Sequence, residues 1–218
     1  EEILKTRVEG TQFLAESLLK LKQTLKIFFC ASAVGFYGNR PSPELVDEFA
    51  PSGKGFLADV CQKWERAAAV AHQKGIRVVS MRLGAVLSPR GGVLAKLLPV
   101  FKLGLGGKLG RGNQIFSWIA VDEIPLIISY LLQKENVSGP VNFVSPQVIS
   151  NVELTKVLGK VLKRPTIFSV PVFGVKLLFG EMGQELLLSG APVIPKKLSE
   201  SGYTFQYADL ETTLRKYI

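Results

Sequence analysis

The sequence predicts an α/β fold built on a parallel sheet, and three observations support this class. An amphipathic stretch over residues 1–22 precedes the near-continuous apolar run 25–32, and residues 56–73 and 76–88 repeat that helix–strand order. Strands that alternate with helices pair in parallel through right-handed crossovers. The composition, 47% hydrophobic and 21% charged over 218 residues, suits a globular domain with a sizeable core.

Each of the two predicted helices carries one apolar face. In the first helix this face recurs at alternating spacings of four and three, with Leu4, Val8, Thr11, Ala15 and Leu18. In the second helix it contains Leu57, Val60, Cys61, Trp64, Ala68 and Ala71. Gly75 ends the second helix, and the strand over 76–88 follows directly. Both helices are therefore expected to cover the sheet.

The chain changes character after residue 90. Residues 91–118 read as a helix followed by glycine-rich loops. Asp122 is placed to cap a helix over 123–133, and residues 139–146 form a short strand. These last two elements are expected to return to the sheet.

The C-terminal part is predicted to be rich in loops and short helices. Ser150 and Glu153 have the spacing of a capping box, and Asp209 is placed to cap the last helix. The apolar stretch 170–180 contains Lys176, which favours a packed helix over a helix resting on a membrane. Together with the glycine-rich segment, this part is expected to form a small α+β lobe.

Composition excludes several function classes. The net charge is +9, but the basic residues are scattered without interleaved aromatic residues, so a solvated surface is expected and nucleic acid is not. No run approaches the ~18–20 apolar residues of an integral membrane segment. Cys30 and Cys61 both lie in apolar stretches and predict reduced, buried thiols in a cytoplasmic protein. With His72 as the one histidine, no metal site is expected.

Candidate functional residues lie where the two strands end. Ligands of parallel sheets bind at the carboxyl ends of the strands, so Ser32, Tyr37 and the segment 82–86 are expected to share one crevice. The Ser32 hydroxyl either donates to a substrate oxygen or a nicotinamide amide, or caps a backbone group. Arg82 either binds a phosphate or ribose, or forms a structural salt bridge with Glu65 or Asp47.

Other candidates are weaker. Arg7, on the first helix, is either a solvated residue or a phosphate contact. The segment "GLGGKLGRG" (104–112) superficially resembles a dinucleotide-binding loop, but it follows no strand and opens no helix, so we interpret it as a turn. His72 is expected to face solvent, and the adjacent carboxylates at 47–48 and 122–123 are interpreted as caps.

The sequence resembles a known family along its whole length. The similarity is carried, in order, by "TRVEGTQFLAESL", "SAVGFYG", "FLADVCQKWE", "MRLGAVLSPRGG", "FKLGLGGKLGRGNQIFSWIAVDE", "GPVNFVSP" and "VIPKKLSESGYTFQYADLETTL". These segments are similar to the epimerase-family branch of atypical extended short-chain dehydrogenases/reductases, a branch with its own C-terminal domain. This family includes proteins called nucleoside-diphosphate-sugar epimerase-like or cell-division-inhibitor-like.

The resemblance implies a Rossmann-type doubly wound sheet that binds NADP. Residues 1–90, with 119–146 returning, correspond to the rest of that domain, and 91–118 with 147–218 to the substrate-side lobe. The family's glycine fingerprint lies on the first strand–helix turn, which would precede residue 1, so an upstream segment is expected. The resemblance matches Arg7, Ser32, Arg82, Gly84 and Val86 to positions near the cofactor.

This sequence departs from the family at the acid–base pair. Family members usually carry Tyr-x-x-x-Lys four residues before a glutamate, and counting back from Glu65 places Cys61 and Leu57 there. Tyr37 is a conceivable substitute acid, whereas burial opposes reactivity of Cys61. Two functions remain: an NADP(H)-dependent epimerase-like oxidoreductase acting on an unidentified small molecule, or a catalytically depleted cofactor-binding protein acting through partners.

Overall fold

The computed structural model describes residues 2–40, 44–170 and 190–218. Its central sheet has the order β1-β2-β7, formed by Ile27–Ala33, Arg77–Leu83 and Gly139–Phe143. All neighbouring strands are parallel. The α/β class expected from the alternating pattern is confirmed, and the predicted helix over 170–180 lies almost entirely outside the described residues.

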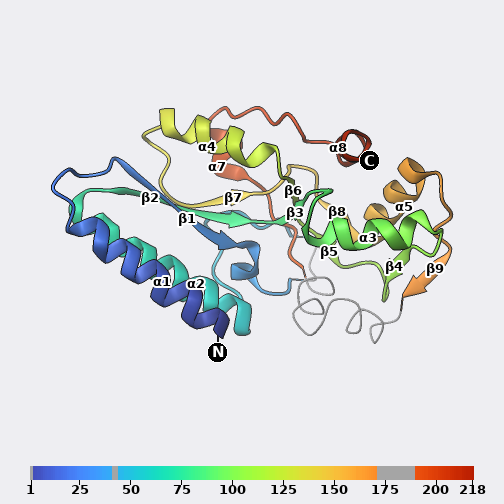
Figure 1. The fold of residues 1–218 in the computed structure, drawn as a ribbon, viewed down its shortest axis with the longest axis horizontal. Coiled ribbons are helices and arrows are strands. Elements are labelled where there is room, and N and C mark those ends of the chain that lie inside the picture. Colours follow the sequence, from blue (N-terminus) through green and yellow to red (C-terminus); the bar gives the residue numbers. More distant parts are fainter. Residues whose placement is uncertain (1, 41–43, 171–189) are drawn as a thin grey trace.

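Helices cover both faces of this sheet (Figure 1). One face carries α1 (Glu2–Leu19) and α2 (Phe56–Ala69), which pack on β1 and β2 through a core that includes Ala15, Cys30 and Ala68. The other face carries α4 (Glu123–Gln133) and α7 (Lys196–Glu200). Short 3-10 helices η1 (Val34–Tyr37) and η2 (Val70–Lys74) follow β1 and α2. The layers bury the apolar faces that the spacing predicts.

The predicted strand over 76–88 is two strands in the structure. After β2, Gly84 interrupts it, and β3 (Ala85–Leu87) pairs instead with β6 (Trp118–Ala120). Gly84 donates its backbone N–H to Phe143, and a Cβ atom there would lie 2.8 Å from the Ser117 carbonyl oxygen. This close backbone approach requires glycine, and it turns the chain from the central sheet toward the distal end of the molecule.

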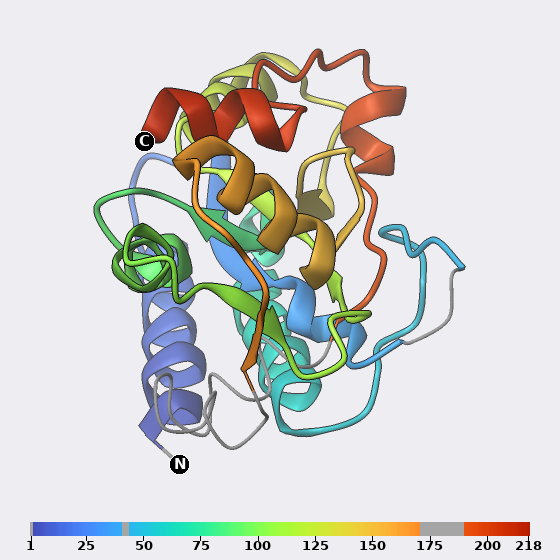
Figure 2. The same cartoon turned by 90° about the vertical axis from the view of Figure 1, so that its right-hand side faces the viewer.

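The distal end, which faces the viewer in Figure 2, is a second packed unit. It contains α3 (Gly92–Lys102), α5 (Asn151–Leu162) and α8 (Leu210–Tyr217). The parallel pair β4 (Gly107–Leu109) and β9 (Phe168–Val170) and the antiparallel pair β5 (Ile115–Phe116) and β8 (Ile149–Ser150) accompany them. Their core includes Leu94, Phe101, Trp118 and Leu158.

Local cap chemistry is partly as expected. The capping box of Ser150 and Glu153 is present, and Asp209 caps α8 by accepting from the Thr212 N–H. Asp122, however, makes no side-chain cap hydrogen bond at α4. Its neighbour Glu123 is buried and accepts hydrogen bonds from the C-terminal segment, including the Tyr207 N–H at 2.7 Å. The cap interpretation of 122–123 is therefore wrong.

Candidate functional site

A buried polar cluster lies at the carboxyl ends of the central strands. Sheet register places Ser32, Arg82 and Asn142 side by side on β1, β2 and β7. Each of the three is at most 3% exposed. Residues paired in a parallel sheet share a face, so one row of polar side chains crosses the sheet beneath α2. Polar groups buried so deeply need partners, because an unpaired one costs about 1–3 kcal/mol.

Glu65 of α2 binds two residues of this row, Ser32 and Arg82. Its carboxylate accepts from Arg82 Nε and Nη2, both at 2.8 Å, and from the Ser32 hydroxyl at 2.7 Å. Burial lowers the pKa of Arg82, but the hydrogen bonds to Glu65 and the charges of its partners outweigh that effect, and the pKa is raised overall. The bidentate ion pair fixes α2 to the ends of β1 and β2. Of the two interpretations of Arg82, the structure shows the salt bridge to Glu65.

Tyr37 extends the cluster from the η1 turn. Its hydroxyl accepts from Arg82 Nη1 at 2.8 Å and donates to Asn142 Oδ1 at 2.7 Å. The residue is fully buried, and burial raises the pKa of the phenol to about 12. The Arg82 guanidinium also lies 3.4 Å from the centre of the Phe36 ring. The geometry favours a structural role for Tyr37 over a role as a proton donor to substrate.

Glu48 joins the cluster to the C-terminal segment. Its carboxylate accepts from the backbone N–H of Asn142 at 3.0 Å and of Lys197, the second residue of α7, at 3.3 Å. Asn142 also donates to the carbonyl of Ile194 at 2.9 Å. Burial raises the pKa of Glu48. The cluster thus connects β7 to the chain around residue 195.

Sequence reasoning missed two members of this cluster. The only signal for Asn142 was a polar side chain inside an otherwise apolar strand, and its partners depend on register. The sequence predicts that Glu48, like Asp47, is a cap, whereas the structure shows it accepting from the backbone of β7, a contact that no local pattern indicates. Gly53 gave no signal either: a Cβ atom there would lie 2.2 Å from the Tyr37 carbonyl oxygen, so the loop packs directly on η1.

The positions expected to carry an acid–base pair face the η1 turn. A Cβ atom on Gly35 would lie 3.4 Å from Leu57 Cβ and 3.9 Å from Cys61 Sγ. Burial raises the pKa of the Cys61 thiol, so the thiol stays protonated at neutral pH. Cys30 is likewise a free, buried cysteine, as the sequence predicts. This side of the turn is lined by apolar groups.

Arg7 lies apart from the cluster. It is exposed on α1, with its guanidinium 5.4 Å from the centre of the Trp64 ring. Gly84 is buried against Ser117, and Val86 is half-buried on β3. The structure therefore brings Ser32, Tyr37 and Arg82 together and leaves Arg7 outside. His72 is exposed, as expected.

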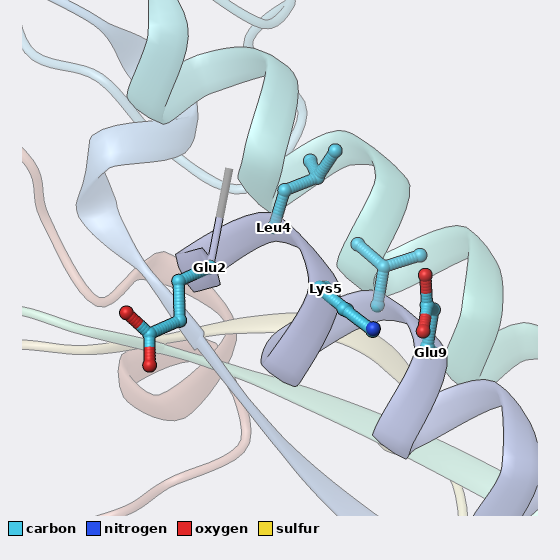
Figure 3. Close-up of a pocket in the computed structure, with 5 residues that line it drawn as sticks. Glu2, Leu4, Lys5 and Glu9 are labelled. Atoms are coloured by element: carbon cyan, nitrogen blue, oxygen red, sulfur yellow. The ribbon is translucent and has the colours of Figure 1, made fainter.

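Two further features lie away from the cluster. A groove beside the first turns of α1 is lined by Glu2, Leu4, Lys5, Val8 and Glu9 (Figure 3). Its lining comes from one helix and includes none of the predicted site residues. Trp118 Nε1 is the one buried side-chain polar atom without a partner among the described residues. A bound acceptor oxygen would satisfy this donor.

The described residues contain no group of three side chains with metal-ligating potential. Among them, too, no helix combines the length and the apolar character needed to cross a bilayer. The predictions of no metal site and no integral membrane segment concern the whole chain, so they stay predictions.

Comparison with known proteins identifies two family models along the chain. Residues 1–144 match the NAD dependent epimerase/dehydratase family, and residues 170–217 match a domain of unknown function, DUF1731. The epimerase family protein Mb2239 of Mycobacterium bovis is 42% identical over 177 residues, which are 81% of this chain and 58% of that protein. The chain thus spans little more than half the length of that relative.

Two solved structures are similar in sequence and in fold. A crystal structure of human epimerase family protein SDR39U1 with NADPH has a TM-score of 0.91 and 32% identity, covering 98% of this chain and 72% of the human one. A nucleoside-diphosphate sugar epimerase from Corynebacterium glutamicum has a TM-score of 0.80 and 36% identity, covering 99% and 42%.

Proposed function

This chain belongs to the NAD dependent epimerase/dehydratase family, and from that premise we propose that it is an NADP(H)-binding, epimerase-like oxidoreductase acting on a small molecule of nucleotide-sugar type. One observation carries the cofactor assignment: the similarity, over 98% of this chain, to a relative whose crystal structure contains NADPH. The two free, buried thiols support a reducing compartment such as the cytoplasm.

The residues at the strand ends fit one part of this cofactor. Ala31, Ala33 and Val86 are half-buried, small or apolar, and suited to a flat ring. The polar groups of Ser32 and Arg82 turn inward to Glu65 and are occupied. The described strand ends therefore suit the nicotinamide ring of the cofactor. They offer no free cation to the phosphates of the cofactor. When bound, NADPH supplies a hydride.

The chain's own residues act by holding this surface in place. The ion pair of Arg82 with Glu65 fixes the ends of β1 and β2, and the Tyr37 hydroxyl fixes the η1 turn. Ser32, Tyr37 and Arg82 are thus proposed as positioning residues. Proton transfer in this proposal does not use a Tyr-x-x-x-Lys pair, because Leu57 and Cys61 stand at the matching positions.

Cofactor binding is tested by titrating tryptophan fluorescence with NADPH and with NADH. We expect saturable quenching that is tighter for NADPH. Ala33→Leu is expected to weaken NADPH binding by at least about tenfold, because the larger side chain occupies the ring surface. Ala69→Leu, on the exposed face of α2, is the matched control. The cofactor assignment fails if neither nucleotide gives a saturable response.

A second function is a cofactor-binding protein without turnover. The apolar lining at Leu57 and Cys61 and the buried Tyr37 hydroxyl favour it, because none of these groups offers a proton to a substrate. Incubation with NADPH and a panel of nucleoside-diphosphate sugars separates the two. Epimerised product or consumed NADPH supports the enzyme; binding with no product from any sugar supports the second function.

A further inference from the structure

The excess positive charge of this chain is confined to one part of it. Residues 89–121 and 154–170 contain nine Lys and Arg residues and no Asp or Glu. The other 18 basic residues balance the 18 acidic ones, so these two segments account for the whole net charge of +9. Basic residues occur along the whole sequence, but they outnumber acidic residues only when these two segments are counted.

The fold brings these two segments together at the distal end. Strands β4 and β9 pair in parallel, with Gly107 opposite Phe168 and Lys108 opposite Ser169. The Arg164 Nε donates to the Lys102 carbonyl at 2.9 Å. The segments 102–108 and 163–168 consequently lie side by side at the end that Figure 2 shows facing the viewer. We call them the distal surface.

Large apolar side chains project from the distal surface. Ile167 is 82% exposed and Leu103 is 75% exposed, and Leu105 and Phe168 are about half exposed. Large apolar side chains gain free energy when they leave water, so exposing four of them on adjacent segments is unfavourable unless something covers them.

Basic side chains surround this apolar group. Lys102, Lys163 and Arg164 are exposed, and Lys108 is half-buried. Within the described part of the chain none of these four forms a salt bridge with a carboxylate. Lys160, in the last turn of α5, is paired with Glu211 at 2.7 Å, which separates it from this group.

We propose that the distal surface docks on an anionic lipid membrane. Exposed aliphatic side chains on loop tips enter the acyl boundary, and surrounding Lys and Arg side chains bind acidic headgroups. Nucleic acid fits less well, because single strands need aromatic stacking platforms and three of the four apolar residues here are aliphatic. The docking is peripheral and leaves the sheet and its buried cluster in the aqueous phase.

Sedimentation of the purified protein with lipid vesicles tests the proposal. We expect binding to phosphatidylcholine vesicles containing about one-third phosphatidylserine, and little binding to phosphatidylcholine alone. The double variant Lys102→Gln/Lys163→Gln is expected to weaken binding by roughly twenty-five-fold, since each basic residue near an anionic surface contributes about fivefold. Lys22→Gln/Lys63→Gln, exposed elsewhere, changes the net charge equally and is expected to bind like the unaltered protein.

The apolar contribution has its own pair of variants. Leu103→Ser/Ile167→Ser is expected to reduce the binding that survives added salt, whereas Leu132→Ser, at a half-exposed position on α4, leaves it unchanged. Far-ultraviolet circular dichroism checks that all variants are folded. The proposal is overturned if both lysine pairs weaken binding equally. Equal binding to uncharged vesicles, or capture of duplex DNA or an acidic peptide with no binding to vesicles, overturns it as well.

Discussion

The buried cluster and the distal surface use the same residue types in opposite ways. In the cluster, Arg82 is 3% exposed and every polar group around it has a partner within the protein. On the distal surface, Lys102 and Lys163 are exposed and no acidic residue lies in either segment. A buried charge needs its partner to keep the fold together, while an exposed, unopposed charge is available to something outside.

The largest effect is expected from breaking the buried ion pair. Glu65→Gln removes the charge that compensates Arg82 and is expected to lower the free energy of unfolding by about 3–5 kcal/mol. Urea denaturation measures the loss. Glu211→Gln, which breaks the exposed pairs with Lys160 and Arg215, is the matched control and is expected to have little effect. Equal losses in the two variants would contradict the comparison.

An intermediate effect is expected from alkaline pH, through a buried thiol in the core between the central sheet and helices α1 and α2. Burial raises the pKa of the Cys30 thiol from 9.0 to about 11. The unfolded chain then releases this proton at lower pH than the folded chain, so stability falls as pH rises from 9.0 toward 11. The loss approaches about 2–3 kcal/mol at the upper end.

The variant Cys30→Ala is the control for the alkaline experiment. Urea denaturation across the alkaline range is expected to show a shallower pH dependence in Cys30→Ala, because the titrating group is gone. Tyr37 continues to contribute, since its pKa is raised from 10.0 to about 12. An unchanged slope in the variant would show that Cys30 does not differ between the folded and unfolded states.

The smallest effect is expected from removing the N-cap of helix α5 in the distal part. Ser150 accepts from the Glu153 N–H at 3.3 Å at the start of α5. Ser150→Ala is expected to lower the free energy of unfolding by about 1 kcal/mol, the usual loss for an N-cap. Thermal unfolding followed by circular dichroism measures it, with the exposed Ser169→Ala as control. A loss as large as that of Glu65→Gln would remove the contrast between the two regions.

Periodicity and composition were enough to predict the α/β class, a helix within residues 1–22 that spans 2–19 in the structure, the helix over 123–133 and the two buried thiols. These features follow from local spacing, because an apolar face must be buried whatever its partner is. The same reasoning placed Ser32, Tyr37 and Arg82 at one sheet edge, since parallel strands end on the same side.

The contacts that those residues make depend on how distant parts of the chain pack together. Asn142 and Glu48 complete the cluster from 60 and 34 positions away from Arg82, a relation fixed by strand register and loop packing. The break at Gly84 likewise depends on the Ser117 carbonyl, which no local pattern reveals. The distal surface also depends on the tertiary structure. Its basic residues look scattered in the sequence, and they lie close together because β4 pairs with β9.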